Sequence, residues 1–173
     1  AHTHKYIQTG IEDCKFGLGI DNGMAMEAIR TILSCSNLDF CGIHGHIGSQ
    51  ILEDEPYRPT GRNLAAFAME VESKLGVQVK EINLGGGFGI MYTEEDTPLP
   101  IVEYMKEAKA GLEEVYSAAG KPLPVIGIEP GRRIVGEAGI TLYTVALRKE
   151  IPGVRSYVSV DGGMTDNIRV SMY

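Results

Sequence analysis

Two histidines stand two positions apart in GIHGHIGSQ, the segment 42–50, and polar residues follow them directly. Because alternate residues of a strand point to the same side, His44 and His46 would share one face of a strand that ends here. Cysteine or carboxylate partners at zinc-ligand spacing are absent, so we expect no metal. His44 fits a buried, hydrogen-bonded histidine, whereas His46, which stands close to Gly48 and Ser49, favours contact with a ligand.

Three consecutive glycines, Gly85 to Gly87, follow an apolar run in INLGGGFGI, residues 82–90. A backbone without Cβ atoms can come close to a ligand and offer its N–H groups to an anion. The dinucleotide-binding pattern GxGxxG fails, because its third glycine would fall at Ile90, and no Lys followed by Ser or Thr completes a P-loop. A tight turn after the strand and a phosphate-binding loop both remain open, and we favour the second.

Glu129 ends another apolar run in GIEPGRR, residues 127–133. Burial of an unpaired carboxylate costs several kcal/mol, so this group is expected to be either paired or functional. Arg132 stands three positions further on and could be its internal ion-pair partner. This structural explanation remains beside a catalytic one.

The three motifs can form one site only if the strands that precede them end at the same edge of the fold. Apolar residues recur at helical spacing in 21–35, 61–75 and 100–119, and a short apolar run follows each of these segments. Alternating helices and strands predict a parallel sheet, with neighbouring strands at 40–46, 80–84 and 125–129. The residues that could take part in catalysis or binding stand at the strand ends. In (β/α)8 barrels the active site lies at the carboxyl ends of the strands.

The predicted fold class is therefore α/β: a partial (β/α)8 TIM-type barrel, its C-terminal half, that runs into the start of a β domain. A complete barrel needs about 250 residues and the chain has 173, so we expect an internal fragment of a longer protein. Residues 1–138 are assigned to the barrel. Residues 139–173 alternate in the manner of strands around the turn IPGV, and they are assigned to an incomplete C-terminal β domain.

Composition excludes several classes of function. The chain is 43% hydrophobic and 23% charged, with a net charge of −7, which fits a globular domain and offers no basic surface for nucleic acid. No apolar run is long enough to span a bilayer, so we expect no membrane association. The three cysteines have no CxxC spacing, which is typical of free thiols in a reducing compartment, and we expect a cytoplasmic protein.

Five motifs, in order along the whole chain, resemble those of the fold-type III pyridoxal-phosphate enzymes, the group of alanine racemase and the ornithine and diaminopimelate decarboxylases. Within that group the resemblance is to the diaminopimelate decarboxylases. The motifs are TGIEDCKFG (9–17), HGHIGSQ (44–50), NLGGGFGI (83–90), EPGRRIVGEAG (129–139) and VDGGMTDNIRVSMY (160–173).

The resemblance implies pyridoxal 5'-phosphate as the cofactor and gives roles to the residues at the strand ends. His46 would lie against the pyridine ring and Glu129 would bond the pyridine nitrogen, so these two are the expected catalytic residues. The other expected cofactor contacts are Ser49, Gly85, Gly86, Gly87, Pro130, Gly131 and Arg132.

The resemblance also implies that Arg132, Arg169 and Tyr173 bind the substrate. A guanidinium binds a carboxylate through two hydrogen bonds, so two arginines suit an amino acid with two carboxylates. The implied reaction is decarboxylation of meso-2,6-diaminopimelate to L-lysine and CO2. Ornithine, arginine or carboxynorspermidine remains an alternative substrate, and Arg169 has the structural alternative of a solvated surface arginine.

Two functional elements of the family are expected outside this chain: the lysine that binds the cofactor and a catalytic cysteine segment that a second subunit donates. The resemblance therefore implies a homodimer with a shared active site, and it predicts that this chain alone is inactive. A non-catalytic relative that binds a partner protein stays an alternative from a different class of function.

Overall fold

The computed structural model describes residues 16–168, in two compact units that divide between Gly136 and Glu137. The elements of the first unit are α1 (Met24–Ser34), β1 (Gly42–His44), α2 (Tyr57–Leu75), β2 (Glu81–Asn83), α3 (Ile101–Ala118), β3 (Val125–Gly127) and α4 (Gly131–Val135). The second unit contains β4 (Val145–Ile151) and β5 (Arg155–Val160).

The first unit is built on a parallel sheet with the strand order β1-β2-β3. Its register aligns Ile43 with Ile82, and Ile82 with Ile126. The prediction of three parallel neighbouring strands is thus confirmed, and so is the α/β class. The ladders hold three residues in each strand and do not close into a barrel.

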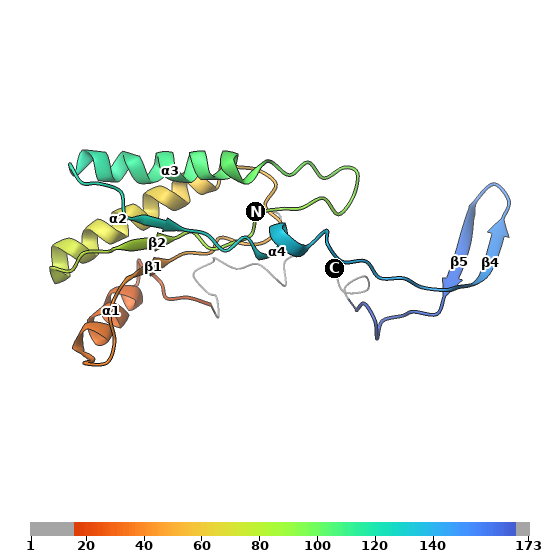
Figure 1. Cartoon of the computed structure of the whole chain (residues 1–173), viewed down its shortest axis with the longest axis horizontal. Coiled ribbons are helices and arrows are strands. Elements are labelled where there is room, and N and C mark those ends of the chain that lie inside the picture. The colour runs from red at the N-terminus through yellow and green to blue at the C-terminus, as the bar shows by residue number, and fades with distance from the viewer. Residues whose placement is uncertain (1–15, 169–173) are drawn as a thin grey trace. The chain divides into compact units, whose positions relative to one another are not determined.

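Helices α2 and α3 lie side by side along one face of this sheet (Figure 1). Two glycines permit their close approach. A Cβ at Gly61 would lie 2.3 Å from the Ala108 carbonyl oxygen, and a Cβ at Gly111 would lie 2.0 Å from that of Arg58. The two backbones therefore touch where larger residues would hold them apart. The buried core of this unit includes Leu64, Phe67, Val71, Ile82, Leu84 and Leu112.

An aromatic cluster packs the loops that follow β1 and β2. Tyr57 stacks on Phe88 with ring centroids 5.3 Å apart, and Tyr104 lies 5.2 and 5.5 Å from these two rings. The Tyr104 hydroxyl donates to the Leu52 carbonyl oxygen at 3.0 Å and accepts from the Leu99 N–H at 3.2 Å. This cluster fixes the two loops that carry the histidine and glycine motifs.

Helix α2 begins at Tyr57 rather than at the predicted position 61. Pro59 stands in its first turn, where a missing N–H leaves no hydrogen bond unmade, so the proline is tolerated although it masks the start of the helix in the sequence. Gly76, with φ of 66°, ends α2 in the left-handed conformation, directly after the predicted helical segment 61–75.

The second unit contains an antiparallel hairpin of β4 and β5, as the alternating sequence predicts. Asp161 follows β5 and accepts a hydrogen bond from the Thr144 N–H at 2.8 Å, which holds the pKa of its carboxyl below the ordinary value.

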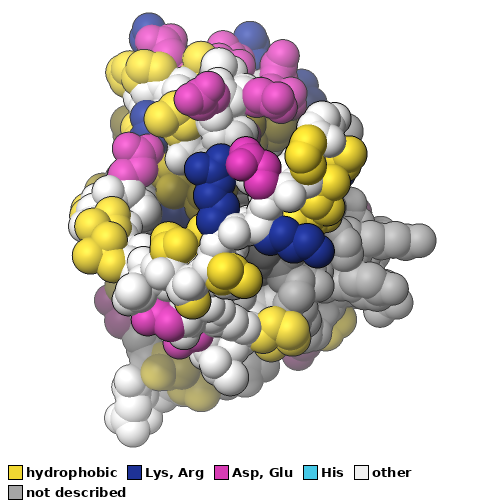
Figure 2. Space-filling view, turned by 90° about the vertical axis from the view of Figure 1, so that its right-hand side faces the viewer, with side chains coloured by type: hydrophobic (Ala, Val, Ile, Leu, Met, Phe, Trp, Pro, Cys, Tyr) yellow, Lys and Arg dark blue, Asp and Glu magenta, His cyan; other side chains and the backbone are white. Residues whose placement is uncertain are grey.

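Across residues 16–168, no helix combines the length and the apolar character needed to cross a membrane. On the face drawn in Figure 2, basic side chains are scattered among acidic and apolar ones.

Candidate active site

The loops that follow β1, β2 and β3 meet at the carboxyl end of the sheet, because parallel strands end at the same edge. The Gly86 N–H donates to His46 Nδ1 at 3.4 Å. A Cβ at Gly86 would lie 2.3 Å from the carbonyl oxygen of Glu129. The structure thus brings together three residues that the sequence singled out in three separate motifs.

Backbone geometry requires each of the three consecutive glycines. Gly85 and Gly87 have φ of 68° and 94°, in the region that side chains rarely adopt. A Cβ at Gly87 would lie 2.1 Å from the Gly48 carbonyl oxygen. The N–H groups of Gly85 and Gly86 already donate to Asn83 Oδ1 and His46 Nδ1. The tight turn therefore explains the glycines by itself, and the phosphate-binding role stays a prediction.

The Glu129 carboxylate has two partners, and neither is Arg132. Asn83 Nδ2 donates to its Oε1 at 3.2 Å, and His44 Nε2 lies 3.6 Å from its Oε2. Among the ion pairs of the described residues there is none between Glu129 and Arg132, so the interpretation of Arg132 as its internal ion-pair partner is wrong. Pro130 and Gly131 turn the chain into α4 after Glu129, and Arg132 lies on that helix.

His44 is not a buried core histidine, so that interpretation is also wrong. Its side chain is 50% exposed, because β1 ends at this residue and the side chain lies beyond the apolar layer of the sheet. The Glu129 side chain is 58% exposed. The carboxylate is therefore oriented by two neighbours and still open to a ligand.

Burial lowers the pKa of His46, the neighbouring His44 lowers it further, and Glu129 opposes both with a smaller effect. The net direction of the pKa is below the ordinary value of 6.5, which favours the neutral form of His46 at pH 7. A neutral imidazole can lie against an aromatic ligand without placing a charge beside it. Within residues 16–168, no three His, Cys, Asp or Glu side chains gather as a metal site would need.

Two adjacent arginines on α4 have different surroundings. Arg132 Nη1 lies 3.5 Å from Gln50 Oε1, and its guanidinium carbon lies 5.8 Å from the centre of the Tyr92 ring. Arg133 instead donates to the carbonyl oxygens of Gly89 and Leu99 at 2.9 and 3.2 Å. Arg132 is therefore held by neutral groups, whereas Arg133 ties α4 to the chain between β2 and α3.

The remaining predicted site residues differ in how far the structure places them. Ser49 is half-buried in the loop after β1. Pro130 immediately precedes α4, and the N–H of Gly131 donates to the Glu129 carbonyl oxygen at 2.9 Å. Arg169 and Tyr173 lie outside the described residues.

Sequence reasoning missed Asn83, Gln50 and Tyr92, and it took His44 for a structural residue. Asn83 offered one signal, since it is a polar residue between an apolar run and the glycines, at the end of a strand. Gln50 and Tyr92 stand in loops without a periodic pattern, and only the folded chain brings them to Arg132.

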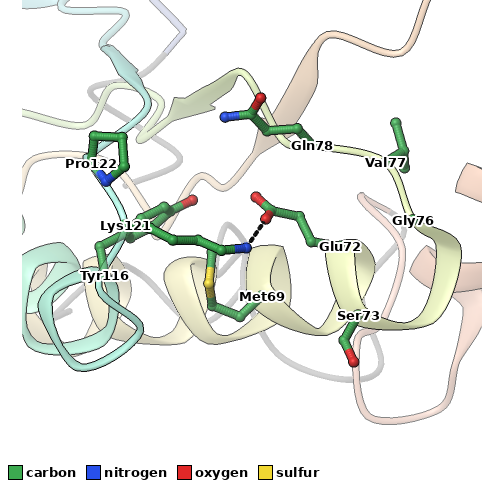
Figure 3. Close-up of a pocket in the computed structure, with 9 residues that line it drawn as sticks. All are labelled: Met69, Glu72, Ser73, Gly76, Val77, Gln78, Tyr116, Lys121 and Pro122. Atoms are coloured by element: carbon green, nitrogen blue, oxygen red, sulfur yellow. Dashed lines mark hydrogen bonds and ion pairs between the residues drawn. The ribbon is translucent and has the colours of Figure 1, made fainter.

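A separate cavity of about 480 Å³ lies at the amino ends of β2 and β3 (Figure 3). Lys121 forms an ion pair with Glu72 there. Because the segments before these strands line it, the cavity is at the opposite end of the sheet from His46 and Glu129. Its lining residues are Met69, Glu72, Ser73, Gly76, Val77, Gln78, Tyr116, Lys121 and Pro122.

Comparison with known families matches residues 1–136 to the pyridoxal binding domain of the pyridoxal-dependent decarboxylases. The whole chain is 47% identical to the diaminopimelate decarboxylases of Bacillus methanolicus and Bacillus subtilis. It spans 40% and 39% of the length of these two relatives.

Comparison with solved structures also finds similarity to diaminopimelate decarboxylases. The diaminopimelate decarboxylase of M. jannaschii in complex with L-lysine matches 99% of the chain with a TM-score of 0.84 and 33% identity, and the match covers 38% of that protein. The enzyme from Helicobacter pylori with L-lysine matches 99% of the chain with a TM-score of 0.81 and 32% identity, over 40% of that protein.

Proposed function

The chain belongs to the family of pyridoxal-dependent decarboxylases, and we propose that the full-length protein converts meso-2,6-diaminopimelate to L-lysine and CO2. One structural observation carries the proposal: the Glu129 carboxylate, held by Asn83 and His44, lies beside the glycine loop and His46 at the carboxyl end of a parallel sheet. The likeness of the whole chain to diaminopimelate decarboxylases supports the choice of substrate.

The residues at this edge fit pyridoxal phosphate. The half-exposed Glu129 carboxylate can accept a hydrogen bond from a protonated ring nitrogen, and the neutral His46 imidazole can lie against the ring. The glycine loop lies beside both residues, because its lack of side chains lets the loops after β1 and β3 approach its backbone closely. We assign the further cofactor contacts to Ser49, Gly85, Gly86, Gly87, Pro130, Gly131 and Arg132.

Bound pyridoxal phosphate supplies the electron sink for the negative charge that remains on the substrate carbon when CO2 departs. Glu129 keeps a proton on the ring nitrogen by accepting its hydrogen bond. Asn83 donates to one carboxylate oxygen of Glu129 and His44 lies 3.6 Å from the other, so this carboxylate is oriented before the cofactor binds.

Arg132 is assigned to a carboxylate of the substrate, since it is the guanidinium on α4 whose contacts are with neutral groups. Arg169 and Tyr173, outside the described residues, are assigned to the second carboxylate. We further propose that residues 1–138 belong to a (β/α)8 barrel, that residues 139–173 begin a β domain, and that the full-length protein is a homodimer with a shared active site.

A substrate panel tests the proposal. Purified full-length protein with pyridoxal phosphate should release CO2 and L-lysine in equal amounts from meso-diaminopimelate. For ornithine, arginine and lysine, kcat/KM should be lower by about a hundredfold or more, because a cationic group at the far end leaves a guanidinium of the protein unpaired. Comparable turnover of ornithine would refute the substrate assignment, and release of CO2 from none of these amino acids would favour the non-catalytic alternative.

A further inference from the structure

A strained backbone position lies beside Arg132. Among the described residues, Gln50 is the one residue other than glycine with a positive φ, at 57°. Side chains rarely adopt this left-handed conformation, because the Cβ atom crowds the following carbonyl oxygen. Positions of this kind persist where surrounding contacts hold them in place, and they gather at functional sites.

The contacts that hold Gln50 are two hydrogen bonds to a single buried residue. Its Nε2 donates to the Ile90 carbonyl oxygen at 2.5 Å, and the Ile90 N–H donates to its Oε1 at 3.2 Å. The next residue, Ile51, exchanges backbone hydrogen bonds of 2.9 Å with Gly87 and Gly89. The Gln50 amide therefore extends this pairing between the loops after β1 and β2.

This pairing fixes which end of the amide is turned to Arg132. The oxygen that accepts from Ile90 also lies 3.5 Å from Arg132 Nη1. A flipped amide would set its NH2 group against two donors, the Ile90 N–H and the guanidinium, and would lose both hydrogen bonds. Tyr92 adds a ring 5.8 Å from the same guanidinium. No carboxylate pairs with Arg132 among the ion pairs of the described residues.

We propose that Gln50 is a positioning residue for Arg132, and this inference rests on the proposed role of Arg132 in binding a substrate carboxylate. A neutral acceptor orients the guanidinium without cancelling its charge, so the charge remains available to the substrate. A glutamate at this position has nearly the same shape, but it would lose the hydrogen bond to the Ile90 carbonyl oxygen, pair with Arg132 and compete with the substrate carboxylate.

Two substitutions in the full-length protein test the proposal. Gln50→Glu should raise KM for meso-diaminopimelate about tenfold or more with kcat within about twofold, because the ion pair opposes substrate binding in the ground state and the transition state alike. Gln50→Met, which removes the acceptor, should raise KM about three- to tenfold. Gln78→Glu is the matched control, because Gln78 is exposed in the cavity at the opposite end of the sheet (Figure 3). Its KM should equal that of the wild type.

A double-mutant cycle separates an effect through Arg132 from a local structural effect. In an Arg132→Met background, Gln50→Glu should weaken substrate binding no further. Substrate affinity, measured by the change in cofactor absorbance on mixing, gives this comparison without turnover. An equal weakening in both backgrounds would overturn the proposal. So would an unchanged KM in both Gln50 variants, whether or not their Tm is lowered.

Failure of the proposed substrate assignment can be distinguished from failure of the proposed role of Gln50. A wild type that prefers another amino acid corrects only the substrate, because every amino acid carries a carboxylate that Arg132 can bind. The comparison of KM values is then made with that amino acid, and the same outcomes support or overturn the role of Gln50.

Discussion

Asn83 Nδ2 lies 3.2 Å from Glu129 Oε1, while Asn83 Oδ1 accepts a hydrogen bond from the Gly85 N–H at 2.8 Å. One amide thus joins the end of β2, the first turn of the glycine loop and the carboxylate that follows β3. Because both ends of the amide are used, its orientation is fixed and the position of Glu129 depends on it.

Asn83→Asp should weaken the binding of pyridoxal phosphate to the full-length protein by about tenfold or more. The new carboxylate can still accept from the Gly85 N–H, but it loses the donor and sets a like charge against Glu129. Titration of the apoprotein with cofactor, followed by absorbance, measures the effect. Asn63→Asp on the exposed side of α2 is the control. Equal affinities of the two variants would show that Asn83 does not orient Glu129.

Gly86→Ala should lower the free energy of unfolding by about 1–3 kcal/mol, the usual cost of an added methyl group in a packed site. The backbone must shift, because the new Cβ would lie 2.3 Å from the Glu129 carbonyl oxygen. Denaturant unfolding of the full-length protein measures the loss. Gly163→Ala is the control, since nothing lies within 4 Å of a Cβ there. A loss no greater than in this control would contradict the close approach of the two loops.

Acid should destabilise the protein through His46. Burial and His44 lower the pKa of His46 in the folded protein, so the unfolded chain binds this proton more readily. The contribution of neutral His46 to the free energy of unfolding is fully present above about pH 6.5, the ordinary histidine value. This contribution is lost as the pH falls from there towards the lowered pKa. His46→Gln should therefore lose less stability than the wild type between about pH 7.5 and about pH 5.5. Melting curves across this range measure the difference, and identical pH profiles would show that His46 does not titrate with a lowered pKa.

Local pattern was sufficient to predict the parallel sheet and the positions of its strands. Apolar runs between amphipathic helices mark β1, β2 and β3, and parallel pairing brings their ends to one edge. That is why His46, Gly86 and Glu129 could be grouped before the structure was known. The start of α2 was not predictable in this way, because Pro59 is a helix breaker in most positions and is harmless in a first turn.

The partners within the site depend on contacts between distant segments, and sequence reasoning failed there. Arg132 is three positions from Glu129, yet the carboxylate contacts Asn83, which is 46 positions away. The left-handed conformation of Gln50 gave no signal either, since glutamine is not a residue that favours it. Tertiary contacts decide which polar groups meet, and periodicity carries no information about them.

The central claim is that the cluster around Glu129 is the cofactor site of a decarboxylase, and Glu129→Gln in the full-length protein tests it most directly. An amide keeps the size of the side chain but holds a proton on the ring nitrogen poorly. We expect pyridoxal phosphate to remain bound, as its absorbance shows, while CO2 release from meso-diaminopimelate falls about a hundredfold or more. Release at the wild-type rate by the variant, with its cofactor bound, would contradict this account of the site.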